Sequence, residues 1–271
     1  DLNLVDVDTA VITAFSRGNE PLFIQGFDLL VNGTNVGVGS AHRQVHYQGT
    51  DKTGIYYNKY DVTEELINGE NVISVMATAK SNRKAFWCKL EVYLTDGTKK
   101  KIIVTDKNWH VLDGSTAFGD YGVKIRSLYF GMVSENVDLC YYPQGWSEVE
   151  YNDDNWPAAW VNPQSMVSDE EVFIPYRSEN TRRFETHEPS KKVIKLGDQD
   201  YLVDLGKESI GSLKVNLQRP PNQRVTILMG EQLQDDGHVR HHLAAGPDYV
   251  ENCTFVKGQN QFTTLQVKNF R

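Results

Sequence analysis

The sequence has few of the features that mark several large classes of protein. It carries three cysteines in 271 residues, and Cys88, Cys140 and Cys253 lie too far apart for a disulfide framework or a Cys-x-x-Cys metal site. No apolar run approaches the roughly 18–20 residues that span a bilayer. The chain has no basic tract, and its formal net charge is −8. We therefore expect neither nucleic acid nor membrane among its partners.

Long helical patterns are also nearly absent, and short alternating runs take their place. In Trp87–Leu94, apolar residues alternate with Lys89 and Glu91, which is the period of a half-buried strand. Asn-Gly and Asp-Gly dipeptides such as Asn32-Gly33 favour tight turns between such runs. Other runs of this kind are Phe27–Val31, Asn71–Met76, Lys101–Thr105, Lys192–Leu196, Tyr201–Leu205, Arg224–Met229 and Asn252–Val256. The pattern predicts an all-β fold of two consecutive antiparallel, jelly-roll-like β-sandwiches.

The expected domain boundary lies in Ser165–Ser190, a charged stretch with Pro175 and Pro189 and little periodicity. Alternation resumes after it. We therefore predict a first sandwich over residues 1–178 and a second over 179–271, both of ordinary domain size.

Neighbouring carboxylates are the first candidates for chemistry, because two carboxyl groups can hydrolyse a glycosidic bond. Asp153 and Asp154 are adjacent, however, and adjacent residues seldom face one scissile bond. We interpret them as turn caps, with Trp156 as a core anchor. Asp235 and Asp236, before Gly237, are likewise interpreted as structural residues, at the tip of a hairpin.

Histidines and tryptophans are the other candidates. His238, His241 and His242 follow an Asp-Gly turn, so no helix supports a zinc spacing, and the sequence predicts no metal site and no cofactor. Motifs for serine hydrolases, phosphate-binding loops and dinucleotides are missing as well. Exposed tryptophans on a sandwich can stack on sugars, although large aromatics are more often core anchors. The candidates for carbohydrate binding are Trp87, Trp146 and Trp160.

The order of the motifs is more informative than any one of them. The first series is Tyr60–Val75 (YDVTEELINGENVISV), Asp96–Thr98 (DGT), Ile103–Trp109 (IVTDKNW), Gly145-Trp146 and Tyr151–Trp156 (YNDDNW). It closely resembles the N-terminal domain of bacterial α-L-rhamnosidases. The second series is Tyr201–Gly211, Val225–Glu231, Leu233–Gly237, Asp248-Tyr249 and Phe262–Arg271. It resembles a following domain of the same family.

This resemblance implies a galactose-binding-like first sandwich and a second sandwich truncated at its C-terminal end. It implies structural roles for Asp61, Asp106, Trp109, Asp153, Asp154, Trp156, Glu231, Asp236 and Gly237. In the family the catalytic carboxylates lie in a helical barrel downstream of Phe270-Arg271, so no catalytic residue is expected in this chain.

The implied function is therefore that of a non-catalytic N-terminal portion of a glycoside hydrolase. The parent enzyme would remove terminal α-L-rhamnosyl groups with inversion, and this portion would support or wall the catalytic barrel. The implied partners are that barrel in the same parent chain and rhamnose-containing glycans. The sequence leaves the compartment open, and a bacterial periplasmic or extracellular location is favoured over a cytoplasmic one.

Two alternatives stay open. Some family domains of this kind bind rhamnose with calcium through the loop after the "GEN.I.V" strand. The corresponding run here, Ala77–Ala85, lacks the carboxylate, glycines and tryptophan of relatives, and calcium prefers several oxygen ligands. One alternative is nevertheless a stand-alone carbohydrate-binding module, and the other is an accessory sandwich of a different glycosidase family.

Overall fold

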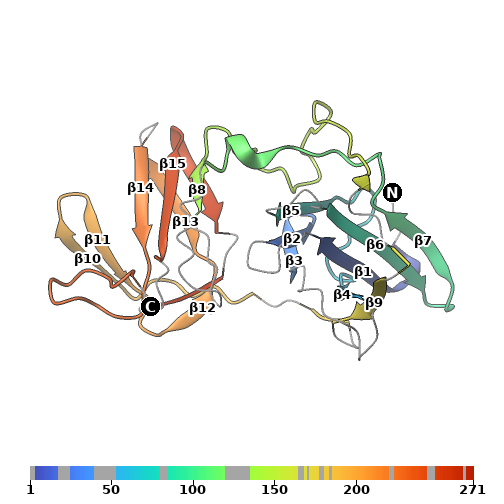
Figure 1. Cartoon of the computed structure of the whole chain (residues 1–271), viewed down its shortest axis with the longest axis horizontal. Helices are drawn as coiled ribbons and strands as arrows, with labels where there is room; N and C mark the ends of the chain where they lie inside the picture. Colours follow the sequence, from blue (N-terminus) through green and yellow to red (C-terminus); the bar gives the residue numbers. More distant parts are fainter. Residues whose placement is uncertain are drawn as a thin grey trace. The chain divides into compact units, whose positions relative to one another are not determined.

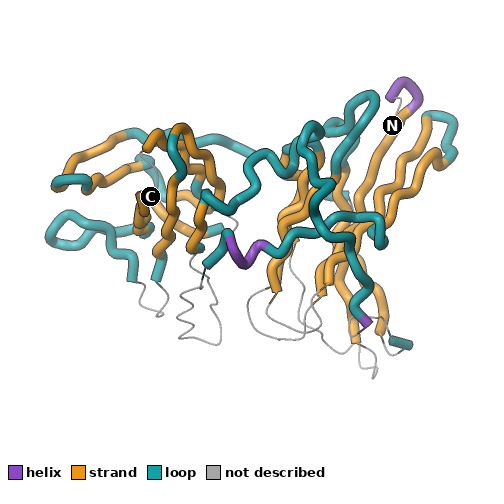
Figure 2. The backbone as a smooth tube through the Cα atoms, turned by 90° about the horizontal axis from the view of Figure 1, so that it is seen from above, coloured by secondary structure: helices purple, strands orange, loops and turns teal. Residues whose placement is uncertain are grey.

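The computed structural model describes residues 4–17, 25–39, 53–79, 85–119, 135–163, 168–169, 171–176, 180–182, 185–219, 223–242, 248–264 and 267–271. Strands and loops make up nearly all of the described residues, and helix among them is confined to short 3-10 turns (Figure 2). The all-β prediction is confirmed. The chain divides into two compact units, residues 1–112 with 145–184, and residues 113–144 with 185–271.

The first unit is built from two sheets (Figure 1). One sheet has five strands in the order β7-β6-β1-β4-β9, and the other has three in the order β3-β2-β5. The elements are η1 (Leu4–Asp6), β1 (Val7–Arg17), β2 (Gln25–Val31), β3 (Thr34–Gly39), β4 (Thr53–Asp61), β5 (Ile73–Ala79), β6 (Ala85–Leu94), β7 (Lys99–Val104) and β9 (Glu171–Pro175).

The apolar core of this unit lies between the two sheets. Alternate residues of β1, Ala10, Ile12 and Ala14, are fully buried and pack with Leu29 and Val31 of β2. Cys88, Leu90 and Val92 of β6 extend the same surface, as the alternation in Trp87–Leu94 predicts. Burial of alternate side chains on two facing sheets is the arrangement of a β-sandwich.

The second unit is made of smaller sheets, β10-β11, β12-β17, β13-β16 and β14-β15-β8. Its elements are η2 (Gly114–Thr116), β8 (Asn136–Asp138), β10 (Lys192–Gly197), β11 (Asp200–Asp204), β12 (Ser209–Gly211), β13 (Lys214–Arg219), β14 (Gln223–Leu228), β15 (Val250–Phe255), β16 (Gly258–Thr263) and β17 (Lys268–Phe270). Val215, Cys253, Phe255 and Phe262 centre one apolar cluster, and Met229 and Phe270 belong to another.

A buried ion pair lies in this second unit. The ammonium of Lys268 on β17 contacts the carboxylate of Glu251 on β15, and both side chains are 2% exposed. Glu251 also accepts a hydrogen bond from the backbone N–H of Glu135. Burial lowers the pKa of Lys268 to about 8, although the nearby Glu135 carboxylate opposes that shift.

Two features differ from a simple run of two antiparallel domains. β9 pairs with β4, and β8 pairs with β15, and both pairs are parallel. Residues 113–144, which the predicted boundary at 178 assigns to the first sandwich, belong to the second unit, because β8 joins its sheet. The main break between the units falls at Phe184 and Glu185.

Candidate functional site

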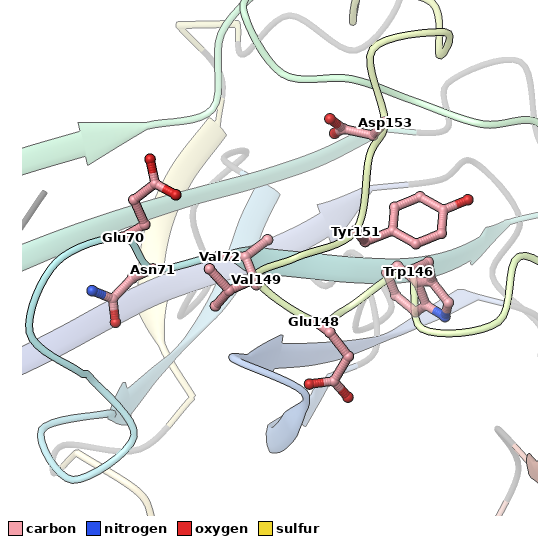
Figure 3. A pocket seen from close by; sticks show the side chains of 8 residues that line it. All are labelled: Glu70, Asn71, Val72, Trp146, Glu148, Val149, Tyr151 and Asp153. Atoms are coloured by element: carbon pink, nitrogen blue, oxygen red, sulfur yellow. The ribbon is translucent and has the colours of Figure 1, made fainter.

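A cavity of about 450 Å³ lies in the first unit, next to the residues that lead into β5 (Figure 3). Its lining comes from two chain segments, residues 70–72 and residues 146–153. The lining residues are Glu70, Asn71, Val72, Trp146, Glu148, Val149, Tyr151 and Asp153.

The wall formed by residues 70–72 is held by two asparagines. Asn71 Oδ1 accepts hydrogen bonds from Ile67 N at 2.9 Å and from Asn32 Nδ2 at 2.8 Å. Asn32 Oδ1 in turn accepts a hydrogen bond from Val72 N at 2.9 Å. Asn32 has a φ of 48°, as the tight turn between β2 and β3 requires. The side of the cavity next to β5 is thus fixed to a strand turn.

The wall formed by residues 146–153 is a series of turns. Gly145, with a φ of 77°, precedes it, and Glu148 N donates to Gly145 O at 2.9 Å. The carboxylate of Glu148 lies over Gly33, where an added Cβ would meet Glu148 Oε1 at 2.6 Å. Gly33 therefore allows this wall to approach the β2–β3 turn.

A histidine contacts the carboxylate at the end of this wall. His110 Nδ1 lies 3.2 Å from Asp153 Oδ2, and His110 forms a β-bridge with Ala158. Backbone hydrogen bonds from Val111 N to Pro157 O and from Ala159 N to Trp109 O continue this pairing. The position of Asp153 is thereby tied to the segment that follows β7.

The cavity combines rings, methyl groups and carboxylates (Figure 3). Trp146 and Tyr151 supply aromatic surface, and the valines supply aliphatic surface. Rings of this type stack on apolar faces, and ionised carboxylates accept hydrogen bonds. The Asp153 side chain is 48% exposed, and Glu70 and Glu148 are exposed. Such wet carboxylates suit hydrogen bonding to a ligand better than general-acid catalysis, which calls for a desolvated carboxyl group.

The three predicted tryptophans lie in different surroundings. Trp146 lines the cavity. Trp87 on β6 is half-buried, with its ring centroid 5.4 Å from that of Phe15. Trp160 is 74% exposed and is not part of the cavity lining. The structure therefore brings only Trp146 into this site, and sugar binding by any of the three stays a prediction.

The motif residues of the first unit make local contacts. Asp61 accepts hydrogen bonds from Thr63 N and Oγ1, and Asp106 accepts one from Asn108 N at 2.8 Å. Trp109 packs against the core, and Trp156 contacts Tyr151 with ring centroids 5.6 Å apart. Asp154 is exposed, and its N–H donates to Asn152 Oδ1.

The motif residues of the second unit lie in the loop after β14. Asp236 Oδ1 accepts a hydrogen bond from His238 N at 3.0 Å, Gly237 has a φ of 86°, and Glu231 is exposed. His238 Nε2 lies 2.9 Å from Asp200 Oδ2. His238 Nδ1 also lies 3.3 Å from Asp236 Oδ1. The contacts of the imidazole with Asp200 and with Asp236 raise the pKa of His238.

Within the described ranges, no group of three or more His, Cys, Asp or Glu side chains is placed to hold a metal ion. Residues 80–84 of the predicted loop Ala77–Ala85 lie outside those ranges. The helices of the described chain include none long and apolar enough to cross a membrane. Cys88, Cys140 and Cys253 are free thiols.

Sequence reasoning did not single out Glu70, Glu148 or His110. Glu70 is part of the Gly-Glu-Asn motif, and Glu148 follows Gly145-Trp146, so both lie in or beside segments that carry the family resemblance. Only the fold brings the two segments together. No periodicity or spacing in the sequence indicates that they share a cavity.

The fold and the cavity together define a pair of β-sandwich units with an open, acidic and aromatic site in the first. Two protein-family models match the two parts of this architecture. The model "Alpha-L-rhamnosidase N-terminal domain" matches residues 23–174, more than half of the chain, and "Bacterial alpha-L-rhamnosidase concanavalin-like domain" matches residues 194–268. The chain belongs to the bacterial α-L-rhamnosidase family, through these two domains.

Individual relatives found by sequence similarity are also α-L-rhamnosidases. An α-L-rhamnosidase of Formosa agariphila is 22% identical over 201 residues, which cover 67% of this chain and 19% of that protein. One of Streptomyces avermitilis is 21% identical over 253 residues, covering 85% of this chain and 23% of the relative. The chain therefore spans about a fifth to a quarter of the length of these relatives.

Solved structures share the fold. The structure of the Streptomyces avermitilis α-L-rhamnosidase complexed with L-rhamnose has a TM-score of 0.62 at 21% identity. The match covers 98% of this chain and 25% of that one. The Aspergillus terreus α-L-rhamnosidase has a TM-score of 0.55 at 19% identity, covering 98% of this chain and 32% of that one.

Proposed function

We propose that these residues form the non-catalytic N-terminal portion of an α-L-rhamnosidase-like glycoside hydrolase. The parent enzyme removes terminal α-L-rhamnosyl groups, and this portion packs on and walls its catalytic barrel. The observation that carries the proposal is the pair of family matches in order along a chain that spans only 19–23% of its relatives. The exposed carboxylates of the cavity agree with it, because they lack the desolvation of a general acid.

The first test is hydrolysis. Purified chain 1–271 is incubated with an aryl α-L-rhamnoside beside the parent enzyme that contains these residues. We expect turnover by the parent and none by the chain alone. Turnover by residues 1–271 would place the chemistry in this chain and overturn the non-catalytic assignment, while an inactive parent would overturn the substrate class.

The supporting role has its own test. The remainder of the parent is produced without residues 1–271, and its thermal stability and kcat/KM on the aryl rhamnoside are measured with and without the added chain. We expect the added chain to raise both, because exposed apolar surface of the barrel would be covered again. A remainder that is equally stable and active alone would contradict the role.

We also propose that the natural targets are rhamnose-containing glycans and that the parent enzyme works in the periplasm or outside the cell. The support for this location is the proposed target, because glycan polymers lie outside the cell. Fractionation of the source bacterium followed by detection of the parent with an antibody against residues 1–271 tests it. Recovery in the cytoplasm would refute it.

A further inference from the structure

We propose that the cavity between Glu70–Val72 and Trp146–Asp153 binds a single neutral sugar unit, without a metal ion. This binding goes beyond the support of a catalytic domain. In the sequence, the cavity residues 70–72 precede β5, whereas the run Ala77–Ala85, where the family resemblance puts calcium ligands, begins within the last residues of that strand.

The apolar surface of the cavity matches one part of a sugar. A pyranose ring has C–H groups on its faces, and a 6-deoxy sugar also carries a methyl group. Trp146 and Tyr151 offer aromatic surface for the first, and Val72 and Val149 offer aliphatic surface for the second (Figure 3). The accessible lining as a whole is mainly polar, which suits a ligand rich in hydroxyl groups better than a purely apolar one.

The carboxylates of the cavity match the hydroxyl groups of a sugar. Glu70, Glu148 and Asp153 are hydrogen-bond acceptors, and sugar hydroxyls are donors. Two of these carboxylates are positioned by the protein, Glu148 over Gly33 and Asp153 beside His110. A hydroxyl bonded to an ionised acceptor gives a stronger hydrogen bond than one between neutral groups.

The walls are set before any ligand arrives. The hydrogen bonds of Asn32 and Asn71 tie residues 70–72 to the β2–β3 turn. The edge-to-face contact of Tyr151 with Trp156 holds the opposite side. A site with fixed walls loses less freedom on binding, which favours measurable affinity for a small ligand.

Charge and geometry limit the ligand class. Three carboxylates repel an anionic sugar such as a uronic acid. They also do not converge on one point, because no described group of acidic side chains could hold a metal ion. A cavity of about 450 Å³ is large enough for a monosaccharide. The remaining rival is an organic cation, which would also favour rings and carboxylates.

The test is an NMR titration of the ¹⁵N-labelled chain 1–271 with L-rhamnose, L-fucose and D-galactose, with EDTA present throughout. We expect saturable shifts for at least one sugar at residues 69–72 and 145–153. Trp146→Ala should weaken binding about tenfold or more, as for the central aromatic anchor of a site. Tyr141→Ala is the matched control, because it removes an exposed aromatic ring that does not line the cavity, and it should leave the affinity within about twofold.

Glu70→Gln is a second variant, chosen because the side chain is exposed and surface substitutions usually have little effect on stability. It should weaken sugar binding about two- to fivefold by loss of a charged acceptor. Shifts that are absent for all three sugars, that need calcium, or that persist in Trp146→Ala would overturn the proposal. So would saturable binding of methylammonium or lysine amide without binding of the neutral sugars, because that result identifies a cation site.

Discussion

The two units bury hydrocarbon alike but bury charge to different depths. The core of the first unit is formed by hydrocarbon side chains with Tyr60 and Cys88 among them, and Phe27, Ile12, Leu29 and Val31 are its largest fully buried members. The second unit buries Phe255 and Cys253 to the same degree. Each unit also buries an ion pair, but the side chains of Arg17 and Glu171 in the first are 7% and 6% exposed, whereas those of Lys268 and Glu251 in the second are 2% exposed.

The difference predicts different weaknesses. Removing hydrocarbon from a core leaves a cavity, whereas removing one partner of a buried ion pair leaves an uncompensated charge. Each unit carries its own reporter, because Cys88 and Cys253 are buried free thiols. Burial raises the pKa of each to about 12, so neither reacts readily until its unit opens. Exposed Cys140 can be replaced by serine to remove background.

The largest effect is expected from Lys268→Met. The substitution leaves the Glu251 carboxylate buried without its cation and lowers the free energy of unfolding of the second unit by about 3–5 kcal/mol. Labelling of Cys253 by an aromatic disulfide reagent, in a Cys140→Ser background, should accelerate about a hundredfold or more, since labelling follows the opening equilibrium. Labelling of Cys88 should stay at its original rate.

The double variant Lys268→Met with Glu251→Gln is the control. It removes both charges of the pair and keeps a side-chain oxygen that can accept from Glu135 N, so part of the lost protection of Cys253 should return, while the nearby Glu135 carboxylate stays buried. Unchanged Cys253 labelling in the single variant would mean that the buried charge pair does not stabilise the second unit.

Leu29→Ala is the converse experiment on the first unit. Leu29 is fully buried between the sheets, and its truncation lowers the free energy of unfolding by about 2–5 kcal/mol through lost burial and a cavity. Cys88 labelling should accelerate, and Cys253 labelling should not. Val5→Ala, at an exposed position of the same unit, should change neither rate. Parallel acceleration of both thiols would show that the units do not open separately.

Local pattern predicted the strands of this fold better than their partners. The runs Trp87–Leu94 and Lys192–Leu196 correspond closely to β6 and β10. β1, however, lies at the centre of the five-stranded sheet, and no motif or run was recognised there. Consecutive buried residues at Ala10, Val11 and Ile12 break the simple alternation that marks a half-buried strand.

The pairing of strands that lie far apart in the sequence could not be predicted from local patterns. Thr53 pairs with Glu171, and Asn252 with Asn136, and no local signal indicates such partners. The expected continuous domain over residues 1–178 consequently differs from the discontinuous unit in the structure. The candidate site shows the same limit, because Trp146 is recognisable as a possible sugar contact but its neighbours Glu70 and Val72 depend on the tertiary fold.

The smallest effect is expected at the surface of the second unit, where His238 joins the loop after β14 to the β10–β11 turn. Hydrogen bonds with Asp200 and Asp236 raise the pKa of His238 above its ordinary value. A raised pKa in the folded state means that the contact stabilises the fold fully below the unfolded pKa of about 6.5, and that this contribution is lost as the pH rises through the folded pKa.

Asp200→Asn should therefore lower the pKa of His238 in an NMR titration of its imidazole. Asp198→Asn, on the same turn but without a contact to the ring among the hydrogen bonds and ion pairs of the described chain, should leave that pKa in place. Because the His238 side chain is 42% exposed, water screens the pair, and Cys253 labelling should respond far less to Asp200→Asn than to Lys268→Met. An unchanged His238 pKa in Asp200→Asn would show that this contact is not made in solution.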